Sequence, residues 1–185
     1  MSIVAQVRGS LFINTFAFLR EVAGPEAPQK VLSGLPADVR VRLERPIRES
    51  SWAGFDDLML YMRAAKALFA PDDPQFYRRM GYFAGQRLRQ HGGFEAMVPE
   101  PKIAVQMSRL VWLALFDVGR VEVAGDADRE AQGTIHDFPA DEVHCQRLCG
   151  ALEGLLTAGS NIAQAEEIEC AAKGAPNCRF RVRWV

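Results

Sequence analysis

Apolar residues recur at intervals of three and four through most of the first 116 positions, a period typical of amphipathic helices. Gly and Pro interrupt the pattern, as expected at helix ends. We therefore predict helices over residues 11–22, 26–32, 37–43, 55–69, 74–88 and 101–116.

The period changes to two after residue 119, which predicts strands over residues 120–124 and 130–138. Residues 141–156 return to a helical pattern, with Asp141 as its N-cap. The C-terminal segment 166–184 predicts a hairpin, because Gly, Pro and Asn lie together at 173–177 and strict alternation follows. We predict one α+β domain over residues 1–185, with N-terminal helices packed on an antiparallel sheet and the order strand–strand–helix–strand–strand at its end.

Composition narrows the class of protein. The chain is 49% hydrophobic and 24% charged, as in ordinary globular domains, and its net charge of −1 does not favour nucleic acid or an acidic membrane. We find no transmembrane run and no signal peptide, so we expect a cytoplasmic protein. There is no phosphate loop or dinucleotide fingerprint, so no nucleotide cofactor is expected. No acid–base or nucleophile–base pair is visible, and we do not expect an enzyme.

Three of the four cysteines converge if the C-terminal hairpin forms. Pairing of Cys170 with Cys178 across it would place both thiols on the buried face, and a helix laid over the hairpin could present Cys145 to them. Cys149 is expected in the core. Free cysteines are often simply buried, so this arrangement alone does not require a metal.

The spacing of Cys145, Gly150 and Gly154, and then of Glu167, Cys170 and Cys178, resembles that of the 4-vinyl-reductase-type small-molecule-binding domain. This domain occurs in sensory modules of aromatic-responsive bacterial activators, and its relatives include nitric-oxide-sensing haem domains and TRAPP vesicle-tethering subunits. Residues 178–184, 116–123 and 8–10 look more similar still to an uncharacterised paralogous family of single-domain proteins from myxobacteria.

The resemblance implies a structural zinc ion held by Cys145, Glu167, Cys170 and Cys178, the positions that hold zinc in the aromatic-sensing relatives. The alternative is a reduced core cluster. In a regular hairpin Glu167 would point outward opposite Arg181, with Glu169 opposite Arg179, and only a bulge near Ile168 would turn Glu167 toward Cys170. His144, next to Cys145, is an alternative zinc ligand to Glu167, although a partly exposed helix histidine is the more usual outcome.

The helices are rich in aromatic residues and Met, which are able to enclose a pocket or simply fill a core. The resemblance favours a pocket between helices and sheet for a small apolar or aromatic ligand or an acyl chain; haem is not expected. The predicted lining residues are Phe55, Met59, Met62, Tyr77, Met80, Gly81, Phe83, Met107 and Trp112.

Two functions follow from these features. The first is a non-enzymatic ligand-binding sensor that signals through an unknown protein partner or a dimer. The second is an adaptor resembling the vesicle-tethering subunits, with a purely structural pocket. The first predicted helix is apolar nearly all round, which predicts a two-fold homodimer through this helix. Its apolar residues are Leu11, Phe12, Ile13, Phe16, Phe18 and Leu19.

Overall fold

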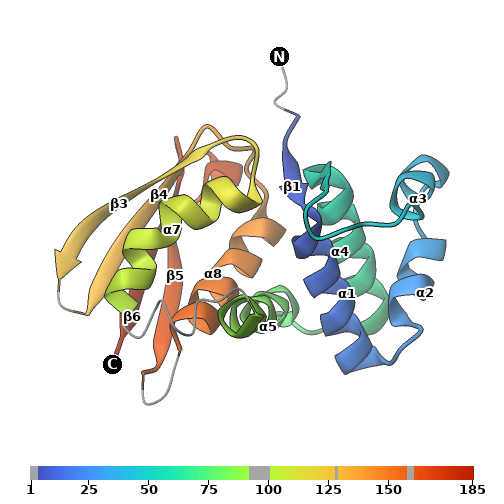
Figure 1. Ribbon diagram of the computed structural model, residues 1–185, viewed down its shortest axis with the longest axis horizontal. Helices are drawn as coiled ribbons and strands as arrows, with labels where there is room; N and C mark the ends of the chain where they lie inside the picture. The colour runs from blue at the N-terminus through green and yellow to red at the C-terminus, as the bar shows by residue number, and fades with distance from the viewer. Residues whose placement is uncertain (1–3, 92–100, 128, 158–160) are drawn as a thin grey trace.

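The computed structural model describes residues 4–91, 101–127, 129–157 and 161–185. The first lobe contains β1 (Gln6–Arg8), α1 (Gly9–Ala23), α2 (Ala27–Ser33), α3 (Ala37–Leu43), β2 (Trp52–Gly54) and α4 (Phe55–Phe69). The helix α5 (Phe76–His91) follows and lies between this lobe and the rest of the chain (Figure 1). The second lobe contains α7 (Pro101–Leu115), β3 (Arg120–Ala127), β4 (Glu130–His136), α8 (Glu142–Leu156), β5 (Ala163–Glu169) and β6 (Cys178–Trp184).

The second lobe is built on one four-stranded sheet in the order β3-β4-β6-β5, with every pair antiparallel. The alternation of β6 buries Cys178, Phe180, Val182 and Trp184 beneath α8. Its arginines lie on the other face, where they pair with acidic residues of β4 and β5. The α+β class and the order of elements are as predicted, and the helices that contact the sheet lobe most closely are α8 and α7.

A two-stranded antiparallel sheet of β1 and β2 was missed by the pattern analysis, because strands of three residues are too short to show a period of two. Arg8 at its end joins three segments. Its guanidinium donates to the carbonyl oxygens of Ser50 at 2.6 Å and Ala114 at 3.1 Å, and it lies 3.9 Å from the ring centre of Trp52. The N-terminal strand is thereby held against the end of α7.

Glycines set the distance between α5 and α8. A Cβ atom at Gly81 would lie 1.8 Å from the carbonyl oxygen of Arg147, and one at Gly150 would lie 1.8 Å from that of Arg78. No side chain fits at such distances, so the two backbones meet directly. Gly150 and Gly154 therefore form the part of the α8 surface on which α5 packs.

Packing within the chain accounts for the apolar surface of α1. Leu11, Phe12, Phe18 and Leu19 are buried, and Ile13 and Phe16 are half-buried, against α2, α4 and α5. The unpartnered helix that motivated the homodimer is thus covered by its own fold, and the oligomeric state stays a prediction. Among the described residues, no helix is long and apolar enough to cross a bilayer.

Candidate functional site

A β-bulge at Ile168 decides which carboxylate faces the cysteines. Glu166 pairs with Arg181 and Glu167 with Phe180, but the next pair joins Glu169 to Arg179, so Ile168 has no partner in the ladder. The bulge turns Glu167 inward and leaves Ile168 37% exposed. The regular register, with Glu167 opposite Arg181, was wrong, whereas Glu169 does pair with Arg179.

The four predicted ligands lie together. One ligand atom from each of Cys145, Glu167, Cys170 and Cys178 can be chosen so that all lie within 4.8 Å of one another. The three cysteines are buried, and Oε1 of Glu167 is buried without a hydrogen-bond partner in the described chain. Four protein ligands of this kind around one point match the donor set of a closed, structural zinc site. Cys149 is buried outside the cluster.

The thiols of the cluster differ in acidity. The Cys145 thiol donates to Sγ of Cys178 at 3.6 Å, and the Ala171 N–H donates to the same sulfur at 3.3 Å. The hydrogen bond from Cys145, aided by that from Ala171, lowers the pKa of Cys178 to about 6 against the effect of burial. The Cys178 thiolate, burial and Glu167 together raise the pKa of Cys145. The lowered pKa favours the thiolate form of Cys178, which is the form in which cysteine binds a metal.

The predicted pocket residues are mostly in the core of the first lobe and its contact with α5. Phe55, Met59, Met62, Tyr77 and Met80 are buried there, and Phe83 and Met107 pack against this core while half-buried. Gly81 contacts the backbone of α8. Core filling, the alternative considered above, describes these eight residues. Trp112 is the one member of the set that lines the cavity described next.

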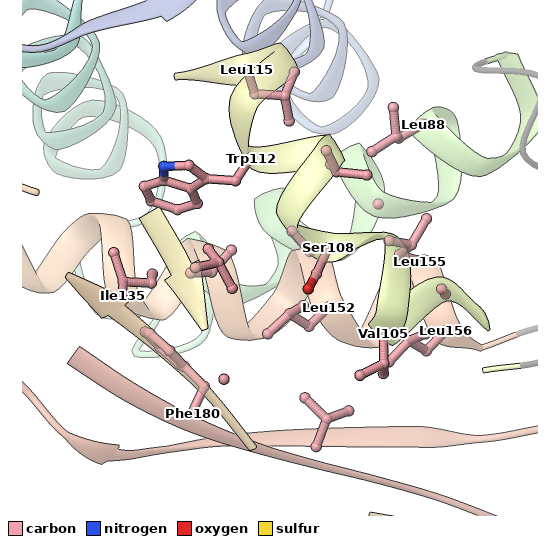
Figure 2. A pocket seen from close by; sticks show the side chains of 18 of the residues that line it. Leu88, Val105, Ser108, Trp112, Leu115, Ile135, Leu152, Leu155, Leu156 and Phe180 are labelled. Atoms are coloured by element: carbon pink, nitrogen blue, oxygen red, sulfur yellow. The ribbon is translucent and has the colours of Figure 1, made fainter. Parts of the chain in front are cut away.

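An apolar cavity of about 190 Å³ lies between the two lobes (Figure 2). Its walls come from α1, α5, α7 and α8 and from the inner face of β3, β4 and β6. Side chains that surround it include Leu88, Val105, Trp112, Ile135, Leu152 and Phe180. The indole N–H of Trp112 donates to the carbonyl of Val118 at 3.1 Å, so the ring is fixed as part of the wall.

His144 is buried in the cavity wall, whereas the sequence analysis expected a partly exposed helix histidine. It is 3% exposed, lines the cavity, and lies within 5.5 Å of the ring centres of Phe55, Phe116 and Phe138. Both ring nitrogens are buried without a partner among the described residues. Burial, together with the charge of Arg147, lowers the pKa of His144 to about 3, so the imidazole is neutral. The missed signal is that 144, 148, 152 and 155 share one face of α8, all lining the cavity.

Comparison of the sequence with family models and with curated proteins gave no match. Solved structures of H-NOX proteins match nearly the whole chain. One from Shewanella oneidensis has a TM-score of 0.74 at 13% identity and covers 96% of each chain. One from K. algicida has a TM-score of 0.70 at 10% identity, also with 96% of each chain covered. An oxygen-binding H-NOX domain related to soluble guanylate cyclases has a TM-score of 0.69 at 12% identity, covering 96% of this chain and 94% of that one.

These neighbours correct the expectation about haem. They are described in Fe(II), Fe(II)–NO and oxygen-bound states, and one study of the family concerns haem distortion, so this fold is one that holds haem. At such low identity the likeness establishes the shared fold alone. It agrees with the distant relationship to nitric-oxide-sensing domains expected from the cysteine spacing.

The residues around the cavity meet one requirement of haem and fail another. The neutral imidazole of His144 has no hydrogen-bond partner among the described residues and would be able to hold the iron of a haem. The volume is too small, because pockets for drug-sized ligands occupy about 300–1,000 Å³, against about 190 Å³ here. A haem would therefore need more space than the cavity offers in this arrangement of its walls.

Proposed function

We propose that this protein is a non-enzymatic sensor domain that binds a small apolar molecule in the cavity between its lobes. The observation that supports this is the cavity itself, with about 190 Å³ of space among apolar side chains. An apolar cavity of about 150 Å³ in another protein is large enough to hold benzene. A monocyclic aromatic or short aliphatic ligand is therefore of the right size, in keeping with the apolar or aromatic ligand expected from the sequence.

The proposal is tested by ligand-induced stabilisation. Benzyl alcohol at a concentration 100 times its Kd should raise the free energy of unfolding by about 2.7 kcal/mol, because it binds only the folded chain. Leu152→Trp should abolish the effect by filling the cavity. Leu113→Trp is the matched control, because Leu113 lies on the outer face of α7 and is 55% exposed. Equal stabilisation of the wild type and Leu152→Trp would contradict binding in this cavity.

Haem is a second candidate ligand, favoured by the unpartnered imidazole of His144. Haem added to the ligand-free protein should give one equivalent of a complex with the absorption spectrum of a histidine-ligated iron, and His144→Phe should lose that spectrum. A spectrum unchanged by His144→Phe would assign the haem to another position, and absence of any complex would remove this candidate.

We also propose that the cluster of Cys145, Glu167, Cys170 and Cys178 holds a structural zinc ion. The support is the convergence of the four side chains and the bulge that turns Glu167 toward them. Such an ion would tie α8 to both strands of the C-terminal hairpin, so its binding energy would be part of the folding energy. Elemental analysis of protein purified without chelator or His-tag chromatography should give one zinc per chain. Well under one metal per chain would favour the reduced cluster.

The adaptor function is the competing proposal, and it gains support if neither benzyl alcohol nor haem binds.

Membership of the 4-vinyl-reductase-type domains, and of the myxobacterial branch, is likewise proposed, from the cysteine spacing and the C-terminal sequence. A sensor or an adaptor needs a protein partner or a second copy of itself. Light scattering decides the second option, since a mass of 20.6 kDa at all concentrations would exclude the homodimer.

A further inference from the structure

The cavity wall carries several unsatisfied polar groups, although such groups also occur elsewhere among the described residues. Three of the buried side chains that have polar atoms without a hydrogen-bond partner in the described chain line it: Ser108, His144 and Arg147. Buried polar groups in folded proteins are nearly always paired, so each exception requires an explanation. Three exceptions around one apolar space indicate a missing partner inside that space.

Of the three side chains, Arg147 is the one that most needs a binding partner. It is 6% exposed, its Nε is buried without a partner, and no described acidic side chain forms a hydrogen bond or ion pair with it. A guanidinium is charged at every physiological pH. An isolated charge in an apolar interior is strongly unfavourable unless a counter-charge accompanies it. Arg78, on the helix facing α8, is by contrast paired with Glu153 at 2.5 Å.

We propose that the cavity takes a small apolar carboxylate, with its body among the apolar side chains and its carboxylate paired to Arg147. This inference rests on the proposed ligand-binding function and specifies the chemical class of the ligand. A carboxylate matches the planar fork of a guanidinium with two parallel hydrogen bonds. A monoanion also balances the single charge, whereas a doubly charged phosphate would leave a net charge buried.

Ser108 and His144 complete the recognition of such a group. The Ser108 hydroxyl lies among the apolar side chains of the cavity (Figure 2) and has a hydrogen to donate. The neutral imidazole of His144, one turn before Arg147 on α8, has one N–H to donate and one nitrogen that accepts. A carboxylate accepts several hydrogen bonds at once, so one ligand group would satisfy the polar atoms that the chain leaves unpaired.

The test compares benzoate with benzyl alcohol, which has the same ring but no charge, by calorimetric titration of the wild type and Arg147→Met. The wild type should prefer benzoate. Arg147→Met should lower the affinity for benzoate by about tenfold to hundredfold, the range expected for hydrogen bonds to a charged group. It should leave benzyl alcohol nearly unchanged. Ligand-free Arg147→Met should also melt at a higher temperature than the wild type, because a buried unpaired charge has been removed.

The outcomes separate this inference from the function on which it rests. If both compounds bind and Arg147→Met leaves their affinity ratio unchanged, the carboxylate is wrong and the sensor cavity stands. If neither compound binds the wild type, the proposed function and this inference both fail. Should Arg147→Met not fold, Arg147→Lys replaces it. Lysine keeps the charge but loses the planar fork, so benzoate should weaken by a smaller factor while benzyl alcohol is unaffected.

Discussion

Ile168 shows how one extra residue in a strand changes the chemistry of a site. Without the bulge, β5 would alternate regularly and Glu167 would join the ion pairs on the outer face of the sheet. With it, Glu169 keeps its outer pair with Arg179, while Glu167 enters the thiol cluster. Two carboxylates separated by one residue therefore have different roles, which substitutions can separate.

Glu167→Gln should lower zinc affinity at least tenfold and lower the melting temperature of the zinc-loaded protein, because an amide is a much poorer zinc ligand than a carboxylate. Glu169→Gln should change zinc affinity and melting temperature very little, since exposed ion pairs contribute about 0–1 kcal/mol to stability. Zinc content and thermal unfolding with and without chelator measure both effects. Equal effects of the two substitutions would indicate that Glu167 is not a ligand.

A matched pair of thiol substitutions tests the same site. Cys178→Ser should resemble treatment of the wild type with chelator, because it removes a ligand. Cys149→Ser should retain zinc, since that thiol is buried outside the cluster. Zinc bound equally by both variants would contradict the proposed ligand set.

His144 makes the stability of the protein depend on pH. The unfolded chain takes up a proton at this residue near pH 6.5, but the folded chain does so only near pH 3, because burial and the charge of Arg147 oppose protonation more than Asp141 favours it. Between these values the unfolded state binds more protons, so stability falls as the pH falls. The loss should reach about 2 kcal/mol by pH 5. Denaturant unfolding should show this slope.

His144→Phe should flatten the acid limb of that curve, and His136→Gln on β4 serves as the control for losing a histidine elsewhere. If His144→Phe leaves the slope between pH 5 and pH 7 unchanged, the buried imidazole is not its source.

At the scale of elements, the contact between α5 and α8 is the one most sensitive to substitution. Gly81→Ala should destabilise the fold by about 1–3 kcal/mol or more, because its Cβ would meet the Arg147 carbonyl and drive the helices apart. Gly34→Ala is the control, since the atom nearest its Cβ would lie 3.5 Å away in ordinary contact. Denaturant unfolding of both variants measures the difference. Similar small losses would show that α5 and α8 can separate without penalty.

Periodicity predicted the long elements well because each buries one face. The helices Ala37–Leu43 and Phe55–Phe69 have the expected bounds, and the C-terminal hairpin forms where turn residues meet strict alternation. The convergence of Cys145, Cys170 and Cys178 was also predictable, since they lie on one helix and one hairpin, whereas Glu167 was implied only by the resemblance, because the regular hairpin pattern places it on the outer face. The cavity was not, because its walls combine α1, α5, α7, α8 and three strands, and no local pattern specifies how distant elements leave space between them.

His144 and Arg147 are buried for the same physical reason that left the cavity unpredicted. A polar residue on a helix is expected to face solvent, and both positions belong to α8, whose surface is covered on several sides by α5, the sheet and the cavity wall. Only the packing of the whole chain shows that these two polar side chains are buried.

At the scale of the whole molecule, the cavity lies where the two lobes meet, with α1 on one side and the sheet on the other (Figure 1). Whatever fills it would touch segments more than 100 residues apart in sequence, such as Leu11 and Ala131. A bound ligand would therefore link the two lobes, so that segments which otherwise open separately would open together. Amide hydrogens of α1 and β4 would then exchange with solvent more slowly by the same factor, set by the ratio of ligand concentration to Kd.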